Sequence, residues 1–509
     1  MSQTDLFVLA GVIGLLLTVG LVGRKKFATT QAYFLAGREL RWWQIGISLF
    51  ATNFSAAAII GLTGAAYLTG IAIYNYEWVG IIAMVVFAMV LAGALRRSQV
   101  YTISQYLEER FGQTVKIAYS AFVIFLIIFI DMASALYAGG MLLREVFPFA
   151  SINLIIFVIM LLVGAYSVLG GLSAIARTDV IQTVVIAVGA FLVAGYIFHA
   201  VGGWSAFVAS APEESLSLIR PLDDIAVPWT GLITGVPILC AYFWFANQNM
   251  VQWVLSAKSE GDARRGLMMA GFMKVVVLFI IVLPGVAAVS LFPGLNQADR
   301  IYPTLLFELL PTGILGLVLA GFVAAIMASV DSTLHAASTI ITMDFVHRGR
   351  QELTPKQLVW TGRIITMIII CFSAIWAPQI GHFGTLFEYV QGVLSYAVAP
   401  IVVVYLGGWF WQRATSSGAL AALVAGVATA ILIGILQQTG YFTTHYLHVP
   451  LPVATVSLVA LIVVSLMSKR HVPPEDRLLV RDTASLTSRD GVIALALTLL
   501  VGLQVIAFW

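Results

Sequence analysis

Residues Ser48-Leu-Phe-Ala-Thr-Asn-Phe-Ser55 place a polar, poorly helical cluster inside an apolar run that spans residues 44–70. A second cluster of this kind, Trp244-Phe-Ala-Asn-Gln-Asn249, lies inside the apolar run 228–255. Isolated polar positions are ordinary where helices pack against one another. Two clusters at comparable places favour a different interpretation, in which both helices break near their middle.

The composition excludes most other classes of protein. Of 509 residues, 60% are hydrophobic and 10% are charged, whereas soluble proteins have about 25% charged residues. The mean hydropathy is +0.98, and the apolar residues come in repeated runs close to the ~20 residues that cross a bilayer. A polytopic, all-α membrane protein is predicted. Soluble enzymes, disordered chains and outer-membrane barrels do not fit, and a net charge of +3 does not suggest nucleic-acid binding.

The apolar runs predict about fourteen membrane-spanning helices with both termini outside. With the N-terminus placed outside, all but four of the 27 lysine and arginine residues fall in inner loops, as the positive-inside rule requires. Arg144, Arg220 and Arg300 would lie outside, and Lys274 lies within a span. Positive charge follows the first run instead of preceding it, so we expect a retained helix and no cleaved signal peptide.

The two polar clusters are five spans apart. Secondary transporters built from inverted repeats break helices at matching positions of their two halves, and the freed backbone groups bind ions and solute near the midplane. The spacing therefore favours a transporter. No loop is long enough to hold a second domain, and no metal-ligand cluster or nucleophile–base spacing suggests an enzyme.

Charged groups within the spans are the candidate functional residues, because each costs at least ~2.5–3.5 kcal/mol at the bilayer centre. Lys274 lies about 13 Å beyond Arg265 along a helix, so it needs an acidic partner. Glu77 and Asp131 are the candidates, in a solute cavity or in a structural ion pair. Asp179 fits an ordinary helix N-terminus, and Asp331 fits either an ion path, a proton carrier or a local cap.

Several ordered motifs resemble the sodium/solute symporter family, and within it the sodium–glucose cotransporter branch. The resemblance covers about residues 34–412. It implies a leucine-transporter-type fold of two inverted five-helix repeats, at about 44–201 and 228–411, with an extra helix and inner loop at 1–43 and additional helices at 412–509. The motifs are Phe34-Leu-Ala-Gly-Arg38, Trp42-Trp43, Ser48 to Ala56, Tyr76-Glu-Trp78, Gly170-Gly-Leu-Ser173, Thr178-Asp-Val-Ile-Gln182, Ala257-Lys-Ser259 and Thr342-Met-Asp344.

The resemblance also implies functional residues. The positions that match the family's solute site supply hydroxyl partners and a ring platform, Tyr242 and Phe243 match its inner gate, and Asp131 is a departure that adds a possible anion. Ala58, Cys240 and Phe243 are less polar than their usual counterparts, which puts glucose and galactose in doubt. The implied solute-binding residues are Asn53, Glu77, Asp131, Trp244, Lys274 and Gln391. The implied sodium-binding residues are Ala51, Phe54, Ala325, Ala328, Ser329 and Asp179.

The resulting hypothesis is sodium-coupled symport of a small hydroxylated solute, a sugar or a polyol, by alternating access. One alternative is a sodium- or proton-coupled carrier of an organic cation that uses Asp131, with Asp331 as a possible proton carrier. Another is a solute sensor that binds without transport. We expect a plasma membrane location, a prokaryotic inner membrane in particular, with Na⁺, the solute and membrane lipid as partners and no obligate protein partner.

Overall fold

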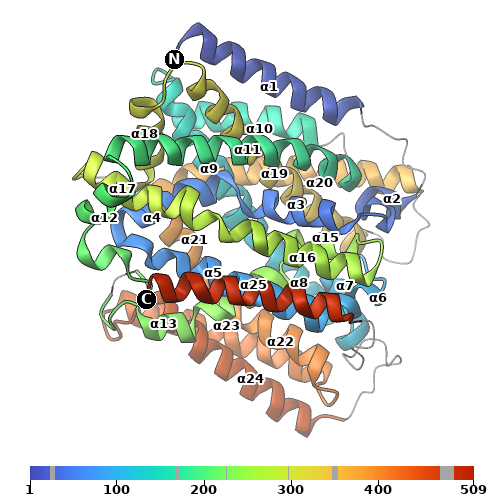
Figure 1. Ribbon diagram of the computed structural model, residues 1–509. Coiled ribbons are helices and arrows are strands. Elements are labelled where there is room, and N and C mark those ends of the chain that lie inside the picture. Colours follow the sequence, from blue (N-terminus) through green and yellow to red (C-terminus); the bar gives the residue numbers. More distant parts are fainter. Residues whose placement is uncertain (23–28, 168–170, 225, 296, 347–353, 470–485) are drawn as a thin grey trace.

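A computed structural model describes residues 1–22, 29–167, 171–224, 226–295, 297–346, 354–469 and 486–509. These residues form one bundle of helices with α1 and α24 at opposite edges, and both termini lie at the same end (Figure 1). We call this the terminal end, and we call the opposite end, where α2, α6 and α7 lie, the basic end. Two isolated bridges are the extent of β-pairing within the described ranges. The prediction of an all-α protein is confirmed.

The helices are given in chain order in four sets, and 3₁₀- or π-helical turns join some of them. The first group is α1 (Gln3–Val22), α2 (Thr30–Phe34), α3 (Trp42–Asn53), α4 (Ala56–Thr69), α5 (Asn75–Val86) and α6 (Ala92–Arg97). The second is α7 (Ile103–Phe111), α8 (Gln113–Leu126), α9 (Ala133–Val146), α10 (Ile152–Ser167), α11 (Leu172–Val201) and α12 (Trp204–Ser210).

The third group is α13 (Trp229–Thr234), α14 (Val236–Ala241), α15 (Gln248–Leu255), α16 (Glu260–Val275), α17 (Leu283–Leu291), α18 (Ile301–Leu309) and α19 (Ile314–Ile341). The fourth is α20 (Pro355–Trp376), α21 (Leu386–Ala397), α22 (Ala399–Phe410), α23 (Ser416–Gln438), α24 (Pro450–Met467) and α25 (Ser488–Ala507). Single π-helical turns include η4 (Ile127–Met132), η6 (Tyr242–Ala246) and η9 (Thr342–Val346).

Within the described residues, ten helical stretches are long and apolar enough to cross a membrane, or eleven if the bent pair α21–α22 is one span. The 42-residue stretch Ala56–Arg97 contains both spans that the sequence suggested there, because α4 ends before Gly70, whose φ of 78° and ψ of −162° are not helical, and α5 begins at Asn75. Gln3–Leu16 and Ile152–Leu161 are apolar but shorter. The count of fourteen and the inverted relation of the repeats therefore stay predictions.

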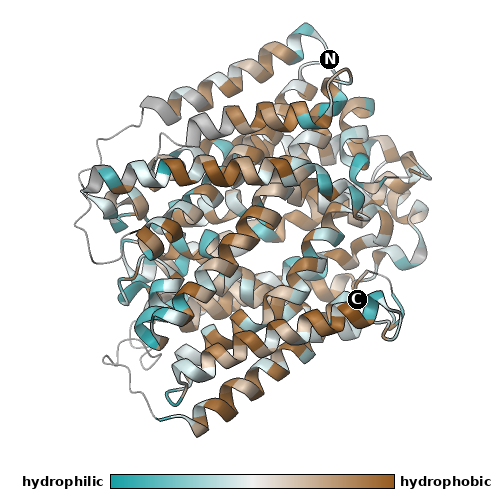
Figure 2. Cartoon of the chain, turned by 180° about the vertical axis from the view of Figure 1, so that it is seen from behind, coloured by the Kyte–Doolittle hydropathy of each residue, from teal (hydrophilic) through white to brown (hydrophobic). Residues whose placement is uncertain are grey.

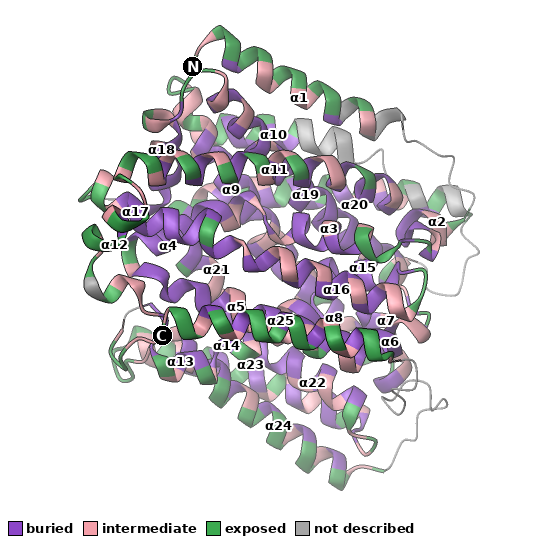
Figure 3. Ribbon diagram, viewed as in Figure 1, coloured by how far each residue is buried: buried purple, intermediate pink, exposed green. Residues whose placement is uncertain are grey.

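Apolar residues cover the helices along their length, and hydrophilic residues gather at the two ends of the bundle (Figure 2). The helices at the edges, such as α1 and α24, expose one face, whereas a central helix such as α19 is mostly buried (Figure 3). The most apolar part of α19 is 83% buried, against 22% for α23. Because α19 is enclosed by protein, its polar residues face other helices and not lipid.

The chain breaks at both predicted polar clusters. Helix α3 ends at Asn53, and α4 starts after Ser55, whose hydroxyl accepts a hydrogen bond from the Ala58 amide over 3.1 Å. The second helix is interrupted at Asn247, whose side chain accepts a hydrogen bond from the Asn249 amide over 2.9 Å. Ser and Asn are preferred N-cap residues, so each cluster restarts a helix as well as ending one. The prediction of two broken helices is confirmed.

The motif Phe34–Arg38 joins three segments of the chain at the basic end through Arg38. The buried Arg38 guanidinium donates hydrogen bonds to the carbonyl oxygens of Gln99, Val100 and Leu255, at 2.6, 2.9 and 3.3 Å. Burial, together with the nearby positive charge of Arg96, lowers the pKa of Arg38 to about 10, so the group stays charged at neutral pH. The predicted inner-loop residues Arg24, Lys25, Lys26, Arg348, Arg350, Arg470, Arg477 and Arg481 lie outside the described residues, as does Gly170.

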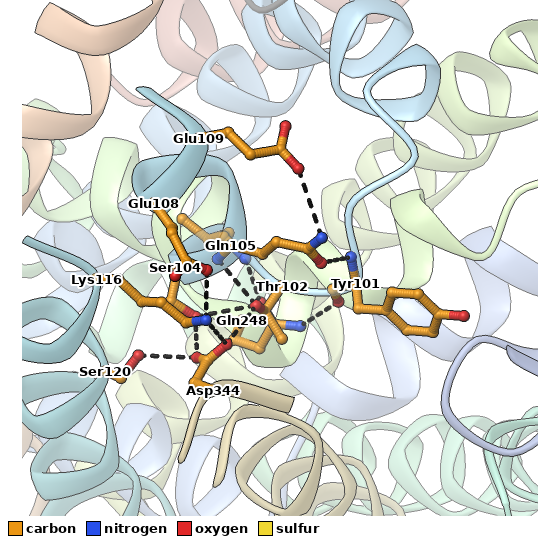
Figure 4. Close-up of polar contacts among 11 residues, drawn as sticks. Tyr101, Thr102, Ser104, Gln105, Glu108, Glu109, Lys116, Ser120, Gln248 and Asp344 are labelled. Carbon is orange, nitrogen blue, oxygen red and sulfur yellow. Dashed lines mark hydrogen bonds and ion pairs between the residues drawn. The ribbon is translucent and has the colours of Figure 1, made fainter. Parts of the chain in front are cut away.

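A buried carboxylate joins the end of α19 to α7 and α8 (Figure 4). Asp344 is 2% exposed and accepts hydrogen bonds from Ser104, from Ser120 at 2.8 Å and from Thr102 at 3.2 Å. The Lys116 ammonium lies 3.7 Å from Asp344 and 2.5 Å from Glu108. Lys116 therefore has one buried and one partly exposed acidic partner. The contributions of the two acids to stability can be compared, because both pair with the same ammonium.

We expect Asp344→Asn to destabilise the protein far more than Glu108→Gln. Removing one partner of a buried charged cluster costs about 3–5 kcal/mol, whereas an ion pair with a partly exposed acid contributes about 0–1 kcal/mol. Thermal unfolding of the two purified variants in detergent measures the difference. Equal losses of melting temperature would show that Asp344 does not hold α19 in place.

Candidate functional site

The first helix break frees two backbone carbonyls. In a continuous helix the Ser55 amide would donate to Ala51 and the Ala58 amide to Phe54. Here the Ser55 amide donates to Asn53 over 2.8 Å, and the Ala58 amide donates to the Ser55 hydroxyl. The carbonyls of Ala51 and Phe54 thus lose their regular helical donors. Both belong to the set that the sequence suggested for sodium.

Lys274 is the centre of a buried charged cluster at the same break. Its ammonium lies 2.5 Å from the Glu77 carboxylate of α5 and donates a hydrogen bond to the Asn53 side-chain oxygen at the end of α3. The Lys274 side chain is 3% exposed, and its ammonium lies 5.4 Å from the centre of the Trp244 ring. Three separate helices therefore meet on one positive charge. Of the two acids considered for Lys274, the structure pairs it with Glu77.

A cavity of about 160 Å³ opens beside this cluster. It is lined by parts of both broken helices together with α5, η4, α19 and α21. Six of the residues that the sequence suggested line it together: Asn53, Glu77, Asp131, Phe243, Ser329 and Gln391. Trp244 and Lys274 do not line it, although the Lys274 ammonium holds two residues that do. The structure thus places Lys274 behind the wall, and the binding roles of all these residues remain predictions.

Asp131 lies on the π-helical turn η4 and reaches the cavity from a different helix than Glu77. The Asn247 side chain, from the second helix break, lies beside its carboxylate. Tyr242 is buried behind the wall close to Asp131, whereas Phe243 faces the cavity. The two residues suggested for the inner gate are therefore separated, and the ring of Phe243 is the one that a solute in the cavity would meet.

The α19 residues suggested for sodium are buried opposite the break in α3. The Ser329 hydroxyl donates to the carbonyl oxygens of Ala325 and Ile326 at 2.9 and 3.1 Å, and Ser329 also lines the cavity. Ala325 and Ala328 are fully buried. Oxygen atoms from α3 and α19 are the ligand type that a hard cation prefers.

Two acids lie deeper, between α3, α11 and α19. Asp179 is fully buried and close to Asp331, so their charges repel. Neither carboxylate oxygen of Asp179 has a hydrogen-bond partner of normal geometry among the described residues, although Ser48 lies beside it. Two neighbouring carboxylates in a buried site are costly unless one is protonated or a cation lies beside them.

Side chains that the sequence argument did not single out tie both broken helices to α19. Thr52 donates to Ser332 over 3.0 Å, and Asn249 donates to Thr333 over 2.7 Å. Gln252 also donates to the Ser332 carbonyl over 3.0 Å. The signal was present as polar residues grouped around Asp331 in an otherwise apolar span, but only Asp331 and Ser329 were considered.

Comparison with known proteins agrees with this arrangement. A sequence model of the sodium:solute symporter family matches residues 33–426, more than half of the chain. The chain belongs to the sodium:solute symporter family. This symporter is 32% identical to sodium/myo-inositol cotransporter 2 of Homo sapiens, an alignment that covers 96% of this chain and 78% of the human protein. It is 31% identical to sodium/glucose cotransporter 1 of Oryctolagus cuniculus, with 87% of this chain and 75% of that protein covered.

Solved structures show the same fold at low sequence identity. A Na⁺-coupled sialic acid symporter, in a substrate-bound outward-open state, matches 92% of this chain and 99% of its own with a TM-score of 0.81 and 20% identity. The nucleobase-cation-symport-1 family transporter MHP1, in a closed conformation, covers 91% of this chain and 99% of its own with a TM-score of 0.59 and 12% identity. At these identities the likeness establishes the fold alone.

Family membership confirms three predictions. The protein is a multi-pass membrane transporter, it is not an enzyme, and sodium is the coupling ion that its family implies. The solute is not decided by membership, because the family includes carriers named for myo-inositol and for glucose.

We expect Glu77 and Lys274 to depend on each other for stability. Lys274→Met and Glu77→Gln should each cost about 3–5 kcal/mol, because either change leaves a buried charge unpaired. The double variant should recover much of that loss, and a double-mutant cycle of unfolding free energies measures the coupling.

The pair Arg300–Glu145 is a suitable control, since it has an N–O distance of 2.7 Å but side chains that are 50% and 35% exposed. Its coupling should be about 0–1 kcal/mol. Additive losses for Glu77 and Lys274 would contradict a shared buried charge.

Proposed function

We propose that this symporter couples sodium to the import of a small hydroxylated solute, a sugar or a polyol. The observation that carries the proposal is the cavity beside the Glu77–Lys274 pair. Its wall offers a carboxylate and two amides, from Glu77, Asn53 and Gln391, next to the rings of Phe243 and Phe387. Polar groups that bind hydroxyls, combined with rings that cover C–H faces, suit a polyhydroxylated ring. The names of the relatives point the same way.

Sodium would act at the boundary between α3 and α19. The carbonyls of Ala51 and Phe54 and the oxygens of Ala325, Ala328 and Ser329 are the ligands in this proposal, and Asp179 adds negative charge nearby. An ion bound by both helices stabilises the arrangement in which α3 and α19 are close. Coupling follows if the ion favours the solute-competent state over the alternative.

A carrier of an organic cation is a second candidate, supported by Asp131. This carboxylate lines the cavity, and among the described residues the groups that face it are an amide and a phenol, not a basic side chain. Asp131→Asn separates the two functions, because it should abolish the binding of a cationic solute and only modulate that of a sugar. A solute sensor without transport would bind solute but not accumulate it.

We place the protein in the plasma membrane, in particular a prokaryotic inner membrane, with the terminal end outside. The described basic residues at the other end, such as Arg97, Arg110 and Arg264, support this orientation under the positive-inside rule. The division into 1–43, an inverted pair of repeats at 44–201 and 228–411, and added helices at 412–509 belongs to the same proposal.

Uptake of radiolabelled myo-inositol and glucose into proteoliposomes tests the function. We expect accumulation under an inward sodium gradient and none under an equal potassium gradient. Ser329→Ala should raise the sodium concentration for half-maximal uptake several-fold, because it removes the one side-chain hydroxyl of the proposed ion site.

Ser338→Ala is the matched control, since Ser338 is a buried serine further along α19 and does not line the cavity. It should leave the sodium dependence unchanged. Accumulation that ignores sodium would contradict the proposed coupling, and binding without accumulation would favour the sensor.

A further inference from the structure

A turn outside the core of the bundle touches the wall of the solute cavity. The connection between α23 and α24 contains the short helical turn η11 (Tyr446–His448). The hydroxyl of Tyr446 lies 3.2 Å from the hydroxyl of Tyr76, and Tyr76 lines the cavity immediately before Glu77. Tyr446 lies beyond residue 426, where the match to the family ends.

The turn is held firmly against the start of the second broken helix. Leu447 is fully buried, and a side chain at Gly231 or Gly235 of the α13–α14 segment would collide with it. His448 forms a hydrogen bond with Thr230 of α13 at 2.7 Å. Both neighbours of Tyr446 in the turn are therefore fixed to the α13–α14 segment, which holds Tyr446 next to the wall of the cavity.

Tyr446 and Tyr76 face different pockets. Tyr446 lines a pocket of about 770 Å³ formed with residues of the α12–α13 and α23–α24 connections and of α21 and α23. Tyr76 lines the solute cavity and packs edge-to-face on Phe387, with ring centres 5.2 Å apart. The pair of hydroxyls thus lies at the boundary between the two pockets, and α13, against which η11 packs, is at the terminal end of the bundle (Figure 1).

We propose that Tyr446 is a positioning residue of the gate at the terminal end: its hydroxyl holds Tyr76 in the closed position between the two pockets. Separation of the two hydroxyls lets Tyr76 turn away from Phe387 and opens a path for the solute. The solute's role rests on the proposed function, but the gate itself does not. Because Tyr76 directly precedes Glu77, the same hydrogen bond also steadies the start of α5, where the buried carboxylate begins.

The test measures how fast a thiol in the cavity reacts from each side of the membrane. The background carries Cys240→Ala and Cys371→Ala, which remove both native cysteines. Ala58→Cys, at a cavity-lining position, supplies the reporter. Membrane vesicles of both orientations are treated with a small membrane-impermeant methanethiosulfonate, and cleavage of a terminal tag by added protease identifies the exposed end.

Tyr446→Phe keeps the ring and removes the hydroxyl. We expect it to raise the rate of modification from the terminal end roughly two- to tenfold, the shift that corresponds to the loss of one hydrogen bond, and to leave the rate from the basic end unchanged or lower. Tyr76→Phe removes the other hydroxyl of the pair and should give the same one-sided increase, which guards against a folding defect in either variant.

Tyr396→Phe is the control. Tyr396 lines the same pocket as Tyr446, but its hydroxyl donates a hydrogen bond to Gln437 and not to a residue of the solute cavity. It should leave both rates unchanged. An unchanged rate in Tyr446→Phe, an equal increase in Tyr396→Phe, or an increase from both ends would overturn the proposal. The assay needs no transported solute, so failure of uptake and failure of the gate are separate results.

Discussion

The buried positive charge of Lys274 is the interaction on which the candidate site depends. An ammonium enclosed by apolar helices is costly unless it is paired and hydrogen-bonded. Glu77 and Asn53 supply that pairing from two other helices, so α3, α5 and α16 must meet at this point for the fold to be stable. The same requirement fixes the break in α3 beside the cavity. The Lys274 ammonium thus contributes to stability and also positions two residues of the solute site, Glu77 and Asn53.

Helix α19 connects this cluster to the second broken helix. Thr52 and Asn249 bind neighbouring residues of α19, Ser332 and Thr333, from the two sides. A change in how α3 packs on α19 therefore also alters the contacts of α15, the helix that follows the other break. An ion held by oxygens of α3 and α19 acts on this shared contact, which gives sodium a physical route to the solute cavity. A route of this kind needs two discrete arrangements, and the ion must prefer one of them.

Much of this could be predicted from the sequence, and the reason is that charge is scarce in it. Lys274 and Glu77 stood out because an apolar span does not tolerate such residues singly. The two polar, poorly helical clusters predicted both helix breaks because they lie at comparable places in two spans. The sequence did not reveal that Lys274 lies behind the cavity wall, because the periodicity of α16 does not show which other helices enclose the face that carries Lys274. It did not reveal the Tyr76–Tyr446 contact, which joins residues 370 positions apart.

Equilibrium binding of radiolabelled myo-inositol to the purified protein, at fixed ionic strength in sodium and in potassium, tests the central claim most directly. If sodium stabilises the arrangement that binds solute, it must lower the solute's Kd, and the solute must raise sodium affinity by the same factor. We expect at least a fivefold difference, about 1 kcal/mol of coupling. The same Kd in both salts would contradict the account, because an ion that favours neither state cannot drive the solute.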